Sequence, residues 1–132
     1  MKWLFLTCLL VAGAGAGAQG ADYAGFVKSL RAEKISVKQE GEVDQPFFSV
    51  KGRVIGLYGE HVQVFEYRSA AAAEAQAALV SPDGRTVGTT KPLWLGTPHF
   101  YKRERLIVLY LGDNPKVLRA LETRLGPPFA GG

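Results

Sequence analysis

Residues 47–67 read FFSVKGRVIGLYGEHVQVFEY, and this stretch decides the fold class. β-Branched and aromatic side chains dominate it and glycines interrupt it, as is typical of short paired strands. Residues 58–60 are expected to form the tip of a hairpin. On the returning strand Val62 faces one side and Phe65 the other, and both side chains are apolar. The stretch therefore predicts a hairpin whose second strand lies inside a sheet.

A second hairpin is expected nearer the C-terminus. Residues 99–102 (HFYK) and 105–112 (RLIVLYLG) form its two strands, and Arg103 with Glu104 forms a charged tip between them. The run LIVLYL at 106–111 is continuously apolar over the length of a strand, which favours a central strand covered on both faces.

Three helices are expected around these hairpins. Residues 22–33 carry apolar side chains at the i, i+3, i+4 and i+7 spacing of an amphipathic helix. Ser69 is an N-cap for the alanine-rich segment 70–79, which is expected to lie close to its sheet because alanine has little side chain. Residues 115–125 follow Asn114, the predicted N-cap, with a proline at the first helical position.

The remaining segments are predicted as connections. Residues 38–46, KQEGEVDQP, are polar and end in proline, so a solvated acidic loop is expected; the sequence lacks the ligand pattern of an EF-hand calcium loop. Residues 81–84, SPDG, have the composition of a turn. Prolines and a glycine divide residues 86–98 into pieces that are too short for more than edge strands.

These elements predict an α+β domain of two layers. A mostly antiparallel sheet of about four to five strands is expected to carry three helices, in the chain order α-β-β-α-β-β-α. The length of 132 residues and the 47% of hydrophobic residues suit one folded domain.

The N-terminus has the pattern of a secretory signal peptide over residues 1–18. Lys2 supplies the positive charge, residues 3–11 supply a short apolar stretch, and Ala16-Gly17-Ala18 matches a cleavage site. A single domain is then expected over residues 19–132, in the periplasm or secreted. The alternative is an uncleaved anchor, but the bulky apolar residues stop short of the about 20 that span a bilayer.

Cleavage would remove the only cysteine, Cys8, together with Lys2. A cysteine-free mature domain excludes thiolate metal sites and cysteine nucleophiles. The formal charge falls from +4 to +3, because 15 rather than 16 basic residues then face 12 acidic ones. This balance is too weak to indicate nucleic acid as a partner. Peripheral attraction to anionic envelope polymers or lipid headgroups is an open alternative.

The candidate binding segment is WLGTPHFY at residues 94–101. Aromatic rings and a histidine crowd a bent segment there, which suits an unidentified small ligand, glycan or protein outside the cytoplasm. The predicted ligand-binding residues are Trp94, His99, Phe100, Tyr101 and, at the first hairpin tip, His61. The structural alternative is that Trp94 and Phe100 pack in the core while His99 bonds a backbone carbonyl.

The leading functional prediction is a noncatalytic exported binding or envelope-associated module, with no cofactor and no metal. No nucleophile motif is present, and two histidines without the H-E-x-x-H pattern do not indicate a metal site. A pair of Glu60 and His61 is disfavoured, because successive strand residues point to opposite faces and both are expected to be solvated at the hairpin tip.

Two alternatives stay open beside this prediction. The first is a small hydrolase-like enzyme in which His99 is the general acid or base and Asp83 or Glu66 orients it. The second is a protein-interaction or inhibitor module, which an exposed Trp94 or Phe100 in an apolar patch would favour.

The strings GEHVQVFEY, SPDG, PHFY, LIVLYLGD and LGPPFAG, over about residues 47–131, resemble a group of small exported bacterial proteins and lipoproteins of uncharacterised function. The resemblance implies an exported compartment and a shared fold, and it implies no activity. Many members carry a lipid-anchored cysteine at the cleavage site, and this chain has no cysteine there. By this match the group's recurrent positions are Gln63, Glu66, Tyr67, Ser81, Asp83, Gly84, Pro98, His99 and Phe100.

Overall fold

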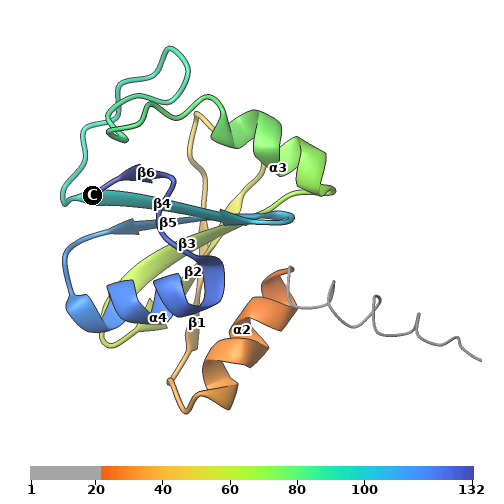
Figure 1. Cartoon of the computed structure of the whole chain (residues 1–132), viewed down its shortest axis with the longest axis vertical. Coiled ribbons are helices and arrows are strands. Elements are labelled where there is room, and N and C mark those ends of the chain that lie inside the picture. The colour runs from red at the N-terminus through yellow and green to blue at the C-terminus, as the bar shows by residue number, and fades with distance from the viewer. Residues whose placement is uncertain (1–21) are drawn as a thin grey trace, which may run out of the picture.

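The computed structural model describes residues 22–132, so the predicted signal peptide at 1–18 and its cleavage site lie outside the described residues. The described part contains three helices and six strands (Figure 1). In chain order these are α2 (Tyr23–Ala32), β1 (Lys38–Val43), β2 (Gly52–Leu57), β3 (Glu60–Glu66), α3 (Ala70–Ala77), β4 (Pro98–Arg103), β5 (Leu106–Leu111), α4 (Pro115–Leu125) and β6 (Ala130–Gly131).

All six strands form one antiparallel sheet in the order β1-β2-β3-β5-β4-β6. Both predicted hairpins are present, and β3 and β5 occupy the centre as their apolar composition predicts. The first hairpin turns at Tyr58 and Gly59, whose φ angles of 51° and 79° fit a two-residue turn with positive φ at both positions. The second turns at Glu104 and Arg105, one residue later than predicted, because Arg103 still pairs with Leu106.

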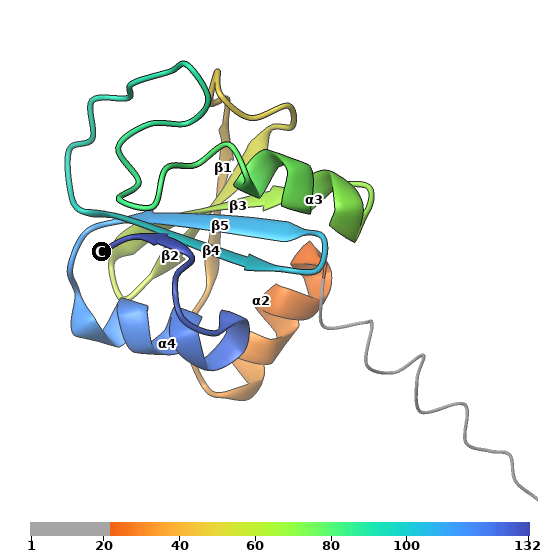
Figure 2. The same cartoon turned by 45° about the horizontal axis from the view of Figure 1, so that its top comes forward.

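The sheet is covered on both faces, which corrects the prediction of two layers. Helices α2 and α4 lie on one face, and α3 lies on the other (Figure 1). Figure 2 shows that the long loop 81–97 folds over the same side as α3. The physical reason is that β3 and β5 are apolar on both faces, so each face needs its own cover.

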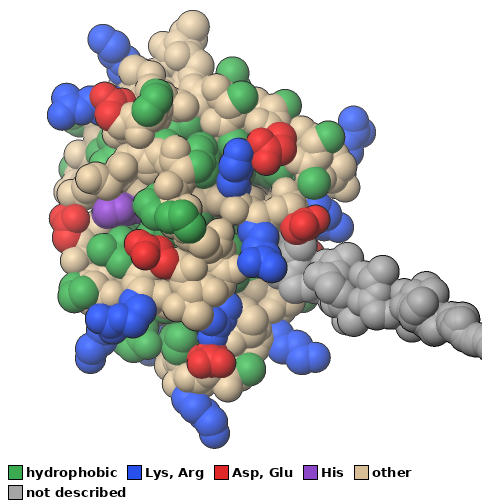
Figure 3. Space-filling model, in the orientation of Figure 1, with side chains coloured by type: hydrophobic (Ala, Val, Ile, Leu, Met, Phe, Trp, Pro, Cys, Tyr) green, Lys and Arg blue, Asp and Glu red, His purple; other side chains and the backbone are tan. Residues whose placement is uncertain are grey.

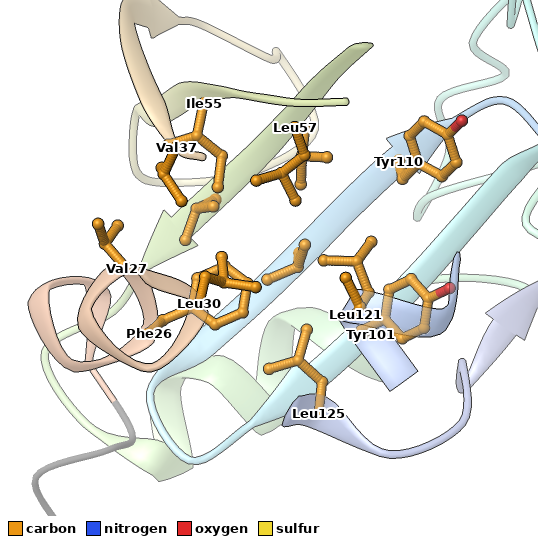
Figure 4. Close-up of a cluster of buried hydrophobic side chains, with 14 of the residues drawn as sticks. Phe26, Val27, Leu30, Val37, Ile55, Leu57, Tyr101, Tyr110, Leu121 and Leu125 are labelled. Carbon is orange, nitrogen blue, oxygen red and sulfur yellow. The ribbon is translucent and has the colours of Figure 1, made fainter. Parts of the chain in front are cut away.

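Each face has its own hydrophobic core. The core beneath α2 and α4 contains Phe26, Leu30, Ile55 and Leu121, together with Tyr101 and Tyr110 (Figure 4). The core beneath α3 is built around the rings of Phe48, Phe65 and Phe100, with edge contacts between ring centroids 4.9–6.4 Å apart.

The predicted helices begin where their caps indicate. The side chains of Asp22, Ser69 and Asn114 accept hydrogen bonds from the backbone N–H groups of Gly25, Ala72 and Lys116, respectively. Helix α3 buries Ala73 and Ala77 against the sheet, as expected for a helix with little side-chain bulk.

The segment 38–46 was predicted as a loop, and this prediction is wrong for residues 38–43. They form β1, the strand at one edge of the sheet, with a bulge between Gln39 and Gly41. Almost every β1 side chain is exposed, so the strand has no apolar face that its sequence could reveal. Charged residues on an edge strand discourage pairing with other chains. With β6 as a further short edge strand, six strands replace the expected four to five.

Candidate functional site

Phe100 and Tyr101 are fully buried, one in each core. They are consecutive residues of β4, so their side chains point to opposite faces, and the sheet is covered on both. Neither side chain is placed to contact a ligand. Phe100 therefore packs in the core, as the structural alternative in the sequence analysis expected.

Trp94 lies half-buried in the loop above the second core. Its indole N–H donates to the backbone oxygen of Gly84 at 2.8 Å. Its ring meets those of Phe47 and Phe100 edge-on, with centroids 5.7 and 6.0 Å away. Trp94 therefore fixes the loop to the body of the protein.

The residues on either side of Trp94 point the other way. Leu93 and Leu95 are 92% and 96% exposed, the highest values among the exposed large hydrophobic residues of the described chain. We call these two residues the leucine tip. Sequence analysis singled out the aromatic ring and not its two neighbours, which are the residues that the structure leaves exposed.

An open groove of about 670 Å³ lies beside the leucine tip. It forms where three distant parts of the chain meet: the turn at 81–85, the loop at 94–98 and the C-terminal residues. We call it the C-terminal groove, and its lining residues are Asp83, Arg85, Trp94, Leu95, Gly96, Thr97, Pro98, Gly131 and Gly132.

Backbone contacts hold the C-terminal residues in the groove wall. The N–H of Gly131 donates to the oxygen of Pro82 at 2.9 Å, and the N–H of Gly132 donates to the oxygen of Pro98 at 2.8 Å. A Cβ at residue 131 would lie 2.0 Å from the Pro98 oxygen, and its φ of 84° is in the left-handed region. Glycine is therefore required at position 131 for β6 to lie against β4.

His99 is 7% exposed and lies behind the groove wall. Its Nε2 is buried without a hydrogen-bond partner and is 3.7 Å from Oδ1 of Asp113. The other oxygen of this carboxylate accepts a hydrogen bond from the Thr97 hydroxyl at 2.9 Å. The imidazole also stacks on Tyr110, its partner on β5, with ring centroids 6.0 Å apart.

The two carboxylates that sequence analysis assigned to His99 are engaged elsewhere. Asp83 accepts hydrogen bonds from the Arg85 backbone N–H and, second in effect, from the Ser81 hydroxyl, and both lower the pKa of its exposed carboxyl. Glu66 accepts from the N–H of Tyr23 at 3.0 Å and pairs with Arg105 at 3.1 Å.

Strand register shows how far Glu66 lies from His99. The row of paired residues that contains His99 crosses β5 at Tyr110 and β3 at Val62. Glu66 is four residues further along β3, roughly 13 Å at about 3.3 Å per residue. The structure brings Asp113 to His99 and leaves Glu66 at the other end of the strand.

His61 is placed by the opposite part of the sheet. Its side chain is 71% exposed, and its Nδ1 lies 2.7 Å from Oε1 of Glu40 on β1. The pairing of β1 and β3 with the two edges of β2 brings these two side chains together. His61 is not among the residues that line the C-terminal groove.

Glu60 was expected to be solvated at the hairpin tip, and the structure corrects this expectation. The Tyr110 hydroxyl donates to its carboxylate, and the Asn114 side-chain amide donates to its Oε2 at 2.9 Å. The backbone N–H of Asn114 donates to the Tyr110 oxygen at 3.0 Å. The Tyr110 hydrogen bond, followed by that of Asn114, lowers the pKa of Glu60. Burial, and then the bond to Glu60, raises the pKa of Tyr110 to about 12.

Within residues 22–132, no three His, Cys, Asp or Glu side chains are grouped so that they could hold a metal ion. No helix in this part of the chain is both long and apolar enough to span a membrane. Comparisons with protein-family models, curated proteins and solved structures give no match. The function is therefore argued from the geometry of the site.

Proposed function

We propose that this chain is an exported, noncatalytic binding module that associates with the cell envelope through the leucine tip. The observation that carries the proposal is the exposure of Leu93 and Leu95, at 92% and 96%. Single exposed apolar residues are ordinary, but two large ones that flank a fixed tryptophan form an apolar projection. Burying such side chains against a partner gives a favourable free energy of about 1.5–3 kcal/mol for each leucine.

The loop that carries the tip is held in place, which favours recognition over random exposure. Besides the Trp94 contacts, Val87 is buried in the second core, and the N–H of Gly88 donates to the oxygen of Leu79 at 2.8 Å. A contact surface that is ordered before binding loses less conformational entropy when it binds.

The surroundings of His99 support binding rather than catalysis. Its ring is 7% exposed, Asp83 and Glu66 have other partners, and the carboxylate of Asp113, which does lie beside it, is 3.7 Å from Nε2, beyond hydrogen-bond distance. A general acid or base must lie within hydrogen-bond reach of the proton that it transfers. The C-terminal groove instead offers the exposed charged groups of Asp83 and Arg85, which can contact a partner beside the tip.

Fractionation of the producing cells tests this proposal. The wild-type chain is expected in the envelope fraction, and the double variant Leu93→Ser/Leu95→Ser is expected to move to the soluble fraction of the exported compartment. Leu79→Ser is the matched control, because Leu79 is also an exposed leucine, at 45%, but lies outside the tip. Equal distribution of the wild type and the double variant would overturn the proposal.

A further inference from the structure

We infer that the leucine tip enters the interfacial region of an anionic lipid bilayer. This inference rests on the proposed function, since it names the part of the envelope that the tip contacts. A loop that presents apolar side chains above a cationic base is one way for a protein to lie on a membrane without crossing it.

The size of the tip favours a lipid surface over a protein partner. Two leucines offer a patch of at most a few hundred Å². A specific protein interface buries about 800 Å² on each partner. The near-complete exposure of Leu93 and Leu95 also means that neighbouring side chains cover very little of either residue, so the tip is convex. A fluid bilayer can close around a convex tip, whereas a protein would need a matching pocket.

The charges at the base of the tip match anionic headgroups. Arg85 and Lys91 line one shallow hollow of about 380 Å³ together with Thr86, Pro92 and Trp94. Arg85 is 82% exposed, and its contact with Asp83 is a loose 3.7 Å pair at the surface. Such exposed pairs contribute little, so the guanidinium is available to phosphate groups. Lys91 makes no ion pair within residues 22–132.

The spacing along the chain keeps Lys91 close to the leucine tip. Lys91 precedes Leu93 by two residues, so their Cα atoms lie at most roughly 7 Å apart. Interfacial helices bury their apolar face roughly 5–10 Å into the boundary between headgroups and acyl chains. The ammonium group of Lys91 could therefore stay among the headgroups when Leu93 reaches this boundary.

The charge of the remaining surface makes this attraction local. On the face seen in Figure 3, Lys and Arg side chains are mixed with Asp and Glu side chains and form no continuous patch of one sign. Residues 22–132 carry 15 basic and 12 acidic side chains, a net charge of +3. Orientation on a membrane would thus depend on the tip and its two cations rather than on the whole domain.

Sedimentation with vesicles tests the inference on protein purified after export of the full chain. Vesicles of phosphatidylglycerol and phosphatidylcholine in equal amounts are compared with vesicles of phosphatidylcholine alone. We expect binding to the anionic vesicles, weakened about tenfold or more by Leu93→Ser/Leu95→Ser and several-fold by Arg85→Gln/Lys91→Gln. Lys28→Gln/Lys38→Gln removes the same charge from α2 and β1 and is expected to leave binding unchanged.

A second variant reports the depth of the tip. In Leu95→Trp, lipids with brominated acyl chains are expected to quench the fluorescence of the new indole. The wild type provides the background, because its Trp94 packs inward. Quenching that is equal in the two proteins would contradict insertion.

The outcomes separate this inference from the proposed function. If neither vesicle binds the protein while envelope association in cells still depends on the leucine tip, the lipid inference is overturned and the tip contacts a protein or glycan of the envelope. If the leucine variants change neither measurement, both proposals fail. Vesicle binding that persists in the double variant would also overturn the lipid inference, because another surface would then be responsible.

Discussion

Oδ1 of Asp113 lies 3.7 Å from the buried Nε2 of His99, in the short connection between β5 and α4. Asp113 is next to Asn114, the N-cap of α4, and the chain turn at this point carries its carboxylate to the strand that holds His99. The carboxylate that lies beside the histidine is therefore not one of the two, Asp83 and Glu66, that sequence analysis assigned to it.

Replacing the two members of this contact should affect stability unequally. Asp113→Asn removes an exposed charge and is expected to change the free energy of unfolding by less than about 1 kcal/mol. His99→Ala removes a buried ring that stacks on Tyr110, and is expected to cost about 1–3 kcal/mol. Urea denaturation measures both values. A larger effect from Asp113→Asn than from His99→Ala would show that the ion contact, rather than ring packing, stabilises this corner.

The Glu60 network should make stability depend on pH at both extremes. Because its folded pKa is lowered below 4.5, Glu60 contributes stability that is present above that value and is lost as pH falls through the folded pKa. The folded pKa of Tyr110 is raised from 10 to about 12, so its contribution is present below pH 10 and is lost as pH rises toward 12. The free energy of unfolding, measured by urea denaturation at a series of pH values, should depend less on pH than in the wild type. This difference is expected at acidic pH for Glu60→Gln and at alkaline pH for Tyr110→Phe.

Tyr110→Phe should also lower stability at neutral pH. It removes the donor to Glu60 and the acceptor for the Asn114 N–H, and is expected to cost about 1–3 kcal/mol. Thr123→Val is a control for the loss of a hydroxyl, because the exposed Thr123 hydroxyl bonds only to the Arg119 oxygen within its own helix. Equal thermal midpoints for the two variants would mean that the network contributes nothing specific.

The indole of Trp94 should position the leucine tip. Trp94→Phe keeps the aromatic ring but removes the hydrogen bond to Gly84, at an expected cost of about 1 kcal/mol. Amide hydrogen exchange in residues 85–96 is expected to accelerate in this variant, while exchange in β3 and β5 is unchanged. Envelope association should weaken although both leucines remain. Unchanged exchange in the loop would show that Trp94 does not fix it.

Two glycines with similar backbone angles should differ in their tolerance of alanine. Gly131 and Gly59 have φ values of 84° and 79°. At Gly59 nothing lies within 4 Å of an added Cβ, so Gly59→Ala costs only the backbone strain of about 1–2 kcal/mol. At Gly131 the Pro98 oxygen blocks the Cβ, so Gly131→Ala should additionally detach β6. Comparable losses in the two variants, measured by denaturation, would contradict this close contact.

Segments whose signal is local could be read from the sequence. The caps at Ser69 and Asn114 and the apolar run of β5 were predicted at their observed positions, and the first helix was predicted over 22–33, close to its observed bounds. Strand β1 could not be read in this way, because its exposed edge carries polar side chains and its hydrogen bonds to β2 leave no mark on side-chain composition.

The candidate site was predictable only in part. The segment 94–101 does border the C-terminal groove, but the residues that reach the surface are not the aromatic ones. Phe100 and Tyr101 are buried because both faces of β4 are covered, a consequence of how helices are distributed over the two sides of the sheet. That distribution is not encoded in any short stretch of the chain.

By itself the sequence determined which segments form the three helices and the two hairpins, since caps, turns and apolar periodicity act between residues close in the chain. Only the tertiary structure decided that Asp113 meets His99, that Glu60 is bound by Tyr110 and Asn114, and that Leu93 and Leu95 remain exposed. Each of these depends on which strands become neighbours and which face each helix covers. Those choices are made by contacts between distant residues, whose free energies no local pattern contains.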